Sequence, residues 1–486
     1  MKIIYTNNCG ILFLCNFVPI KKRNDMSKVL IDYERFLEQK RHKGSDYGIE
    51  PVFMPPQMFP YQQYVAEYAI KKGRCAVFLD TGLGKTLIEI TTAVNYSRYT
   101  NKPVLIITPL AVAFQFIREA EKFGIDEIEY SKDGRYTKKI VVCNYERLQN
   151  FDAAKFDCVI LDESSILKNY DGAIKQEVTT FLKKVKYRFL FTATPSPNDF
   201  IELGTSSEAL GYLGFTDMLT KFFTNNEDTI SPQHIGTKWR LKGHAEEAFF
   251  RWVSSWSISA RKPSDLGFDD TKHILPELIT RFHVVENTQP LCVNGQMQLF
   301  NIVAKSFFEI RAEQKRTIEL RCEQAVSLAA QNECSVYWTN LNQEAEILGQ
   351  LDKSAYEIKG SMSLDKKEDI LLSFFQGDIK KLITKPKITA FGLNWQHCNH
   401  TVYFPTFSYE QYYQAIRRFW RFGQKFPVTV DIVHSDGQSR IIEALKAKAK
   451  KANDLFSALN ANLNKSYDTS KKGFDKELQL PSFLNF

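Results

Sequence analysis

The sequence has no C-x-x-C pair, although it contains nine cysteines. The cysteines are odd in number and are scattered along the chain. Zinc ribbons and disulfide frameworks need closely spaced pairs, so this pattern argues against both and favours a reducing compartment. The segment His397-Cys398-Asn399-His400 has residue types that bind metals, but it lacks a distant partner pair. A role in the core or in a loop is therefore the better interpretation of this segment.

The sequence also lacks an apolar run that is suited to crossing a bilayer. The candidate Ile11–Ile20 is short and contains Asn16 and Pro19. A basic cluster, Lys21–Arg23, follows it instead of a small-residue cleavage site. We therefore predict no membrane association, and we expect the first 25 residues to be a poorly packed extension.

No strong charge imbalance is present. The chain of 486 residues has 64 basic and 56 acidic residues, which gives a net charge of +8. This mild excess permits a polyanionic partner without requiring one. The length is typical of two to four domains, and a charged content of 25% with 44% hydrophobic residues is typical of globular proteins. No internal repeat and no nuclease or methyltransferase pattern is evident.

Two parts of the chain show the same pattern of short apolar segments followed by segments of mixed polarity. In the first part, strands are expected at Cys75–Asp80, Val104–Thr108, Ile140–Cys143, Cys158–Asp162 and Arg188–Thr192. In the second part, they are expected at Ser335–Trp338, Leu382–Thr384, Thr401–Phe404 and Val428–Val433. Near-continuous apolar strands are typical of parallel sheets that are covered on both faces. The sequence therefore predicts an α/β fold with two doubly wound parallel sheets.

The strand pattern stops between about Gly204 and Pro290, in a region rich in aromatic and basic residues. We predict a mainly helical insertion there, then a long helix or helix pair over 296–331. The chain becomes helical and basic after Ser435, and polar and partly disordered from Ala461. The predicted organisation is an N-terminal extension (1–45), a first α/β domain (46–203), the insertion (204–290), a second α/β domain (291–440) and a basic helical tail (441–486).

A phosphate-binding loop is predicted where the first apolar strand ends at Asp80. Glycines let backbone N–H groups approach phosphate oxygens, and a helix N-terminus adds a positive dipole end. Lys85 would reach the β- and γ-phosphates, and Thr86 would offer its hydroxyl to Mg²⁺. We therefore expect the nucleotide to be held by Thr81, Gly82, Leu83, Gly84, Lys85 and Thr86.

Asp162 and Glu163 directly follow the apolar run that begins at Cys158. Ligands of doubly wound sheets bind at the carboxyl ends of the strands, where the phosphate loop also lies. Asp162 is predicted to bind Mg²⁺ opposite Thr86, and Glu163 to polarise the attacking water. An apolar run ending in Asp-Glu is common by chance, so it is informative only together with the phosphate loop.

Two arginines near the end of the second part, Arg418 and Arg421, are three residues apart and would share one face of a helix. Alone, an arginine-rich helix is usually a solvated surface. The second part has no phosphate loop of its own, however. This asymmetry favours one ATP site between two domains, with the arginines stabilising charge on the γ-phosphate across the cleft.

Taken in order, these motifs resemble those of superfamily 2 helicases and translocases. The phosphate loop resembles motif one, Asp162–Ser165 the DEAD/DEAH-type box, Thr192–Thr194 the Ser/Thr-Ala-Thr motif and Gln414–Gln424 the arginine-finger motif. The R-x-x-R-x-G-Q ending is similar to the Snf2-related branch, which contains chromatin-remodelling ATPases, and the arrangement looks most like phage-encoded helicases of that branch. The resemblance covers about residues 55–435 and implies two tandem RecA-like domains.

The resemblance also implies roles for individual residues. Gln62 stands in the position that reads adenine, and Gly392 and Asn394 belong to a motif that contacts the nucleotide. Residues implied to couple the ATP site to nucleic acid are Thr192, Thr194 and Gln414. Residues implied to contact nucleic acid are Thr108, Pro109, Asn144, Tyr145, Trp338, Thr339, Thr384 and Lys385.

The sequence departs from the family pattern at several positions. Ser165 replaces the usual His or Asp at the fourth position of the DEAD/DEAH box, which weakens its expected coupling role. Trp420 stands where remodellers often have His, and Pro386 lies in a fifth motif that is about two residues longer than usual. Leu79 replaces the first glycine of the strict loop consensus, as is common in helicases.

The predicted function is an ATP-dependent DNA translocase or helicase that uses ATP and Mg²⁺. The implied partner is double-stranded or branched DNA, with replication or recombination proteins as further partners. We expect a monomer in a bacterial or phage-infected host cytoplasm. The alternatives are an RNA helicase of the same fold and a nucleotide-gated nucleic-acid-binding module that does not cycle. A kinase that uses only the first loop would leave the second part unexplained.

Overall fold

A computed structural model describes residues 47–109, 112–225, 239–286, 291–293, 296–298, 307–389 and 394–468. All of these residues belong to one structural unit that begins at Gly44. The predicted N-terminal extension (1–45) and Gly392 lie outside the described residues.

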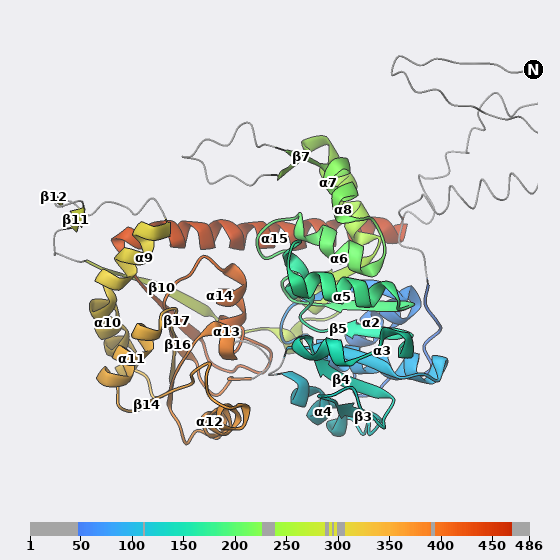
Figure 1. Cartoon of the computed structure of the whole chain (residues 1–486), viewed down its shortest axis with the longest axis horizontal. Helices are drawn as coiled ribbons and strands as arrows, with labels where there is room; N and C mark the ends of the chain where they lie inside the picture. The colour runs from blue at the N-terminus through green and yellow to red at the C-terminus, as the bar shows by residue number, and fades with distance from the viewer. Residues whose placement is uncertain are drawn as a thin grey trace, which may run out of the picture. The chain divides into compact units, whose positions relative to one another are not determined.

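The first sheet is parallel throughout and, in the described part of the chain, has seven strands in the order β3-β4-β2-β5-β6-β1-β9. Their bounds are β1 Arg74–Leu79, β2 Val104–Thr108, β3 Ile128–Tyr130, β4 Ile140–Asn144, β5 Cys158–Leu161, β6 Tyr187–Phe191 and β9 Ser257–Ala260. The helices that accompany it are α2 Pro60–Lys72, α3 Lys85–Thr100, α4 Ala113–Lys122, α5 Ala173–Lys183, α6 Glu202–Leu210, α7 Phe215–Phe222 and α8 Glu246–Ser254. We call this sheet and these helices the first lobe (Figure 1).

The second sheet is also parallel, with the described strands in the order β10-β17-β16-β13-β15-β14. Their bounds are β10 Leu278–Val285, β13 Ser335–Trp338, β14 Ala355–Glu357, β15 Lys381–Thr384, β16 His400–Tyr403 and β17 Val428–Ser435. The accompanying helices are α9 Phe307–Arg316, α10 Ile318–Ala330, α11 Asn342–Leu351, α12 Leu364–Gln376, α13 Pro386–Thr389 and α14 Tyr409–Ile416. We call this part the second lobe, and the prediction of two parallel α/β sheets is confirmed.

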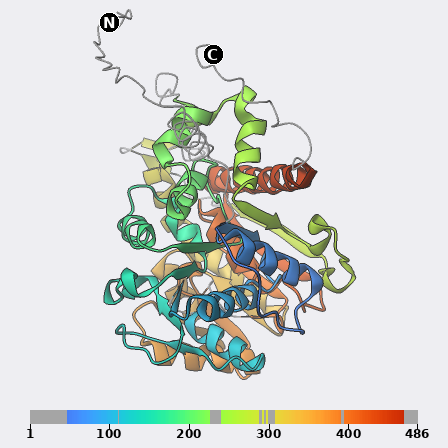
Figure 2. The ribbon, with the colours of Figure 1, turned by 90° about the vertical axis from the view of Figure 1, so that its right-hand side faces the viewer.

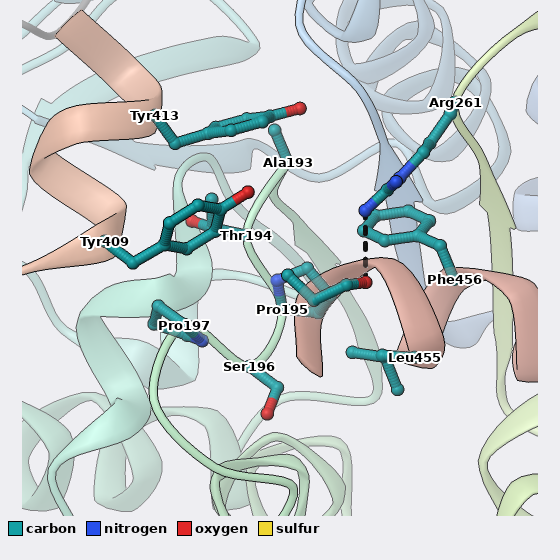
Figure 3. Close-up of a pocket in the computed structure, with 11 residues that line it drawn as sticks. Ala193, Thr194, Pro195, Ser196, Pro197, Arg261, Tyr409, Tyr413, Leu455 and Phe456 are labelled. Carbon is teal, nitrogen blue, oxygen red and sulfur yellow. Dashed lines mark hydrogen bonds between the residues drawn. The ribbon is translucent and has the colours of Figure 1, made fainter. Parts of the chain in front are cut away.

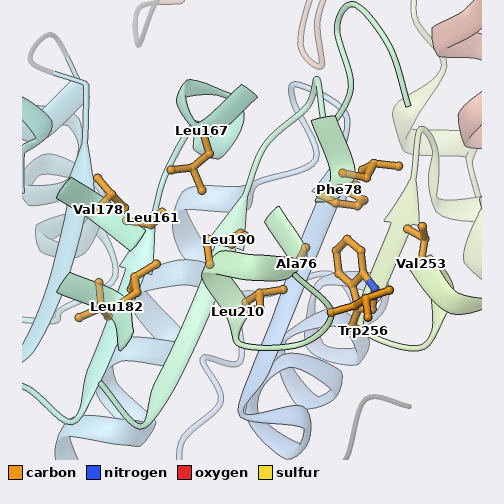
Figure 4. Close-up of a cluster of buried hydrophobic side chains, with 14 of the residues drawn as sticks. Ala76, Phe78, Leu161, Leu167, Val178, Leu182, Leu190, Leu210, Val253 and Trp256 are labelled. Atoms are coloured by element: carbon orange, nitrogen blue, oxygen red, sulfur yellow. The ribbon is translucent and has the colours of Figure 1, made fainter. Parts of the chain in front are cut away.

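The central strands of the first sheet are buried on both faces because their side chains alternate between two apolar layers. Ala76 and Phe78 of β1 point into one layer, together with Trp256 (Figure 4). Val77 and Leu79 of the same strand point into the other layer, with Ile90 of α3. A strand that is apolar at every position can satisfy both layers, which explains the continuous hydrophobic runs in the sequence.

The prediction of a mainly helical insertion between Gly204 and Pro290 is wrong. This interval contains α7 and α8, but it also contains strands of both large sheets. β9 pairs with β1 of the first sheet, and β10 pairs with β17 of the second. β9 reads Ser-Ile-Ser-Ala, and β10 lies at a sheet edge with several exposed positions, so neither has the apolar signature of a central strand.

Two short hairpins and a helix pair complete the described structure. β7 Phe223–Asn225 pairs with β8 Trp239–Leu241, and β11 Leu291–Val293 pairs with β12 Gln296–Gln298, both antiparallel. Within the described residues, the predicted helical region over 296–331 contains the helix pair α9 and α10, whereas its first residues, Gln296–Gln298, form β12.

A single helix, α15 Ser439–Asp468, connects the second lobe back to the first. It passes beside α8 in both views of the ribbon (Figures 1 and 2). Lys451 forms an ion pair with Asp199, and Asn460 accepts a hydrogen bond from Ser259 at 2.8 Å. The helix continues to Asp468, so the polar segment predicted to lose structure from Ala461 is helical at its start. In the part of the chain that the structure describes, no helix combines the length and hydropathy needed to span a membrane.

We predict that Arg321→Ala destabilises the second lobe. Arg321 is fully buried, and it donates to Glu344 at 2.7 Å and to the Gln314 carbonyl at 2.6 Å. Removing it leaves the buried Glu344 carboxylate uncompensated, which costs roughly 3–5 kcal/mol. The midpoint of urea unfolding should fall accordingly.

A matched control for Arg321→Ala is Lys380→Ala, which breaks an exposed ion pair with Glu333 in the same lobe. Exposed pairs contribute little to stability, so this variant should unfold like the wild type. Equal midpoints for the two variants would contradict the interpretation of Arg321.

Candidate functional site

The phosphate loop lies between the end of β1 and the start of α3 at Lys85. Gly82 and Gly84 both have left-handed backbone conformations, with φ angles of +88° and +77°. A Cβ atom at Gly84 would lie 2.1 Å from Nε2 of Gln62, so only glycine fits there. Lys85 donates to the Leu79 carbonyl at 3.0 Å and to the Asp80 carbonyl at 3.4 Å, which holds its ammonium group at the end of β1.

Gln62 braces this loop from α2. Its Nε2 donates to the Leu83 carbonyl at 3.1 Å, and its Oε1 accepts from the Phe59 backbone at 2.9 Å. The Tyr61 hydroxyl donates to the same Leu83 carbonyl at 3.1 Å. The predicted role of Gln62 in reading adenine stays a prediction, and the structure adds a contact with the loop itself.

Asp162 and Glu163 lie at the carboxyl end of β5, at the same sheet edge as the phosphate loop. Oδ2 of Asp162 accepts a hydrogen bond from the Thr108 hydroxyl at 2.9 Å, and its carbonyl accepts one from Tyr145 at 2.6 Å. Glu163 has a φ of +49°, which is rare for a residue with a side chain. Its carboxylate accepts a hydrogen bond of 3.4 Å from Thr192. Such strain is typical of positions where a side chain must be aimed.

Residues of both lobes line one cavity of about 600 Å³. The first lobe contributes Lys85, Asp162 and Glu163, and the second contributes Arg418 and Arg421. The other predicted nucleotide residues on its wall are Gln62, Thr81, Gly82, Gly84, Thr86 and Asn394. Leu83 is buried, and its carbonyl accepts hydrogen bonds from Tyr61 and Gln62, so its predicted contact with the nucleotide stays a prediction.

Burial shifts the pKa of charged groups on both sides of this cavity. Desolvation, then the charge of Glu163, raises the pKa of Asp162 to about 7. Burial likewise raises the pKa of Glu163. Desolvation, then Arg421, lowers the pKa of Arg418 to about 9, and desolvation, then Arg417, lowers that of Arg421 to about 10. Every one of these groups would be stabilised by an added ligand of opposite charge.

The donor set of the cavity suits a magnesium ion carried by phosphates. Asp162 and Thr86 offer a carboxylate and a hydroxyl oxygen, which are hard donors. Among the described residues, no three His, Cys, Asp or Glu side chains gather into a preformed metal site. Mg²⁺ typically uses one or two protein oxygens and completes its octahedron with phosphate oxygens and water.

The arginines reach the cavity from a turn, which corrects the prediction that they share a helix face. Helix α14 ends at Ile416, and residues 417–421 form turns. The Arg418 backbone donates to Ala415 at 3.2 Å, and its carbonyl accepts from Trp395 at 2.9 Å. Side chains that leave a tight turn can converge without helical spacing, and so both arginines still line the cavity.

Most residues predicted to contact nucleic acid have buried side chains. Those of Thr108, Asn144 and Tyr145 lie in the layer beneath Asp162. Thr339 and Thr384 are also buried, and Trp338 stacks on Trp395 inside the second lobe. The predicted contacts of these six residues with nucleic acid stay predictions, and any such contact in this conformation would have to come from backbone atoms. Pro109 and Lys385 are partly exposed, and their predicted contacts stay predictions.

The predicted coupling residues come from both lobes: Thr192 and Thr194 follow β6 of the first lobe, and Gln414 lies on α14 of the second. Thr194 donates its backbone N–H to the Thr192 hydroxyl at 3.0 Å. Tyr409 and Tyr413 of α14 face the loop of Thr194, with Phe456 of α15 nearby (Figure 3). Gln414 is buried on the same helix, and its amide finds no hydrogen-bond partner among the described residues. Their coupling roles stay predictions.

Sequence reasoning missed several residues of the site. Asp80 forms an ion pair with Arg417 across the lobes, and it accepts a hydrogen bond from Tyr413. His273 stacks on Phe422 with ring centroids 4.8 Å apart beside the phosphate loop. The sequence shows two consecutive arginines, Arg417 and Arg418, but no sequence pattern indicates that Arg417 pairs with Asp80.

We predict that Gly84→Ala abolishes nucleotide binding without unfolding the protein. The added methyl group meets Gln62 and a backbone angle that L-residues avoid, so the loop must rearrange. Titration with a fluorescent ATP analogue measures the effect. Gly349→Ala is the matched control, because no atom lies within 4 Å of its added Cβ. An affinity equal to that of the control would refute the assigned loop geometry.

Comparison with known proteins gives matches in the order of the two lobes. The family "Type III restriction enzyme, res subunit" matches residues 54–197, and "Helicase conserved C-terminal domain" matches residues 318–423. The SWI2/SNF2 ATPase core of Sulfolobus solfataricus, solved in complex with dsDNA, covers 87% of this chain and 97% of its own. That structure is 18% identical to this chain in sequence, and the TM-score is 0.40.

Curated relatives include chromatin-remodelling proteins. The SWI/SNF-related matrix-associated actin-dependent regulator of chromatin subfamily A-like protein 1 of Xenopus tropicalis is 27% identical over 164 residues. The DNA annealing helicase and endonuclease ZRANB3 of Bos taurus is 30% identical over 172 residues. Each match covers 32% of this chain but only 17% and 16% of the relatives. The two helicase-type family matches follow one another along the chain, and the relatives are Snf2-related proteins. The chain therefore belongs to the superfamily 2 helicases, in their Snf2-related branch.

Proposed function

We propose that this chain is an ATP-driven motor that moves along duplex DNA. The observation that supports this most strongly is the composition of one cavity. It joins Lys85 and Glu163 of the first lobe to Arg421 of the second. Hydrolysis in such a site depends on the relative position of the lobes, so each cycle of nucleotide binding and release can be converted into movement.

In this proposal, Lys85 and the backbone N–H groups of the phosphate loop bind the β- and γ-phosphates. Glu163 orients the attacking water and accepts its proton, and Thr192 holds the Glu163 carboxylate at 3.4 Å. A magnesium ion held by Asp162 and Thr86 would neutralise phosphate charge. Arg418 and Arg421 stabilise the charge that develops on the transferred phosphoryl group.

The raised pKa of Glu163 supports its role as a base. A carboxylate with an ordinary pKa is a weak proton acceptor near neutral pH, whereas burial makes Glu163 more basic. Lys85 and then Arg418 oppose this shift, because their positive charges favour the ionised carboxylate. The approach of the second lobe therefore also affects the ionisation of the base.

DNA is the proposed track for two reasons. The R-x-x-R-x-G-Q ending at Arg418–Gln424 resembles the Snf2-related branch. The relative from Bos taurus is named a DNA annealing helicase. Contacts with DNA would be mainly to phosphates, and the net charge of +8 permits them. A strand-separating RNA helicase would use the same ATP site.

We predict that Lys85→Ala abolishes ATP hydrolysis, whereas Glu163→Gln blocks turnover but retains ATP binding. The lysine contacts the bound phosphates, but the carboxylate acts only on the water. The assay measures hydrolysis with no nucleic acid, single-stranded DNA, duplex DNA, branched DNA and RNA. Stimulation by duplex DNA is expected to be strongest. If none of these polymers stimulates the wild type, the motor proposal fails, and wild-type turnover by Glu163→Gln would refute its role.

We predict that Arg421→Ala lowers hydrolysis more than it weakens DNA binding. Loss of an arginine finger typically costs about 10³–10⁵ in kcat. Arg251→Ala is the control, because Arg251 is an exposed arginine on α8 outside the cavity. DNA affinity is followed by fluorescence anisotropy at one fixed salt concentration. An equal loss of hydrolysis and DNA affinity would instead favour a DNA-contact role for Arg421.

A further inference from the structure

Asp80 and Arg417 form a buried ion pair between the two lobes. Asp80 is the last residue before Thr81 of the phosphate loop, and only 2% of its surface is exposed. One carboxylate oxygen pairs with the Arg417 guanidinium, and the other accepts from the Tyr413 hydroxyl. The Thr81 backbone N–H also donates to this second oxygen at 2.6 Å. A single carboxylate therefore links the phosphate loop to two residues of the second lobe.

Arg417 is equally well fixed on its own side. Its Nη1 donates to the Trp420 carbonyl at 3.2 Å, and its guanidinium lies 4.4 Å from the centre of the Trp420 ring. It also lies 5.2 Å from the Tyr413 ring. Burial opposes the charged form of Arg417, but Asp80 together with Tyr413 and Tyr409 outweighs this effect and keeps the pKa of Arg417 above its usual value. Through these contacts, Arg417 connects the end of α14 at Tyr413 with Trp420 of the turn that contains Arg418.

The same turn contacts the loop through its backbone. A Cβ atom at Gly82 would lie 3.0 Å from the Phe422 nitrogen and 3.7 Å from the Arg421 Cβ. The turn is thus seated directly on the phosphate loop, with little space between them. Trp420 anchors its outer side by donating to the Pro276 carbonyl at 2.6 Å.

We propose that Asp80 and Arg417 are positioning residues, which dock the turn onto the phosphate loop and thereby place Arg418 and Arg421 against the γ-phosphate. This inference rests on the ATPase function proposed above. Neither residue needs to touch the reacting atoms. A displacement of about 1 Å in the finger arginines can cost on the order of 10²-fold in rate, so the docking contact sets the activity of the site.

The alternative is an ion pair that merely holds the lobes together. The two interpretations predict different effects of the ion pair on the affinity for ground-state and transition-state ligands. A general contact between the lobes affects the bound ground state and the transition state alike, whereas a positioning contact for finger arginines acts mainly on the transition state. Affinity for Mg·ADP and for Mg·ADP–aluminium fluoride, which mimics the transition state, separates the two without any need for turnover.

We expect Arg417→Ala and Asp80→Asn in the full chain to bind Mg·ADP within about threefold of wild type. Their preference for the aluminium fluoride complex over Mg·ADP should fall by about 10²-fold. Because both residues act through one contact, the double variant should lose no more than roughly threefold beyond the worse single variant. Arg417→Lys keeps the charge but not the planar fork, and it should recover part of the preference.

Lys451→Ala is the matched control, because it breaks an ion pair between α15 and the first lobe away from the phosphate loop. It should leave the preference unchanged, and thermal unfolding curves verify that every variant is folded. Equal loss of both affinities, losses that multiply in the double variant, or a wild type without any preference would each overturn the inference. A wild type that shows the preference but no stimulation by nucleic acid would refute the motor proposal and leave the inference standing.

Discussion

The burial of charged side chains between the two lobes is the constraint on which the rest of the structure depends. Carboxylates from the first lobe and guanidinium groups from the second share a cavity where water screens them poorly. Burial raises the pKa of Asp162 and lowers that of Arg418, so neither charge is fully compensated by the protein. In the proposed function, the phosphates of a nucleotide would compensate the arginines and its magnesium ion would compensate Asp162. Binding would then depend on the position of the lobes.

The two parallel sheets contribute different parts of the cavity wall. In the first sheet, the loops that follow β1 and β5 lie at the carboxyl ends of the strands, where the proposed function places the phosphates and the cation. The second has no phosphate loop and contributes a short turn after α14. The ion pair of Asp80 with Arg417 holds that turn against the loop after β1. Helix α15 also connects the second lobe to the first, through contacts such as the ion pair of Lys451 with Asp199.

The strengths and failures of sequence reasoning follow from burial. β2 and β5 were predicted within one residue because a strand covered on both faces must be apolar throughout. β9 and β10 were missed because edge strands carry polar or exposed residues. The doubly wound fold was predictable from the central strands alone. The interval 204–290 was misread because it contributes only edge strands to the two sheets.

For the site, the sequence by itself identified the glycine-rich loop, the acidic pair, and Arg418 and Arg421, all of which line the cavity in the structure. Glycine conformation and strand-end position depend on local chain chemistry, which a sequence displays directly. Only the tertiary structure showed that the hydroxyl groups of Thr108 and Tyr145 donate hydrogen bonds to Asp162. It alone paired Asp80 with Arg417, because contacts between residues more than 300 positions apart depend on how the lobes pack.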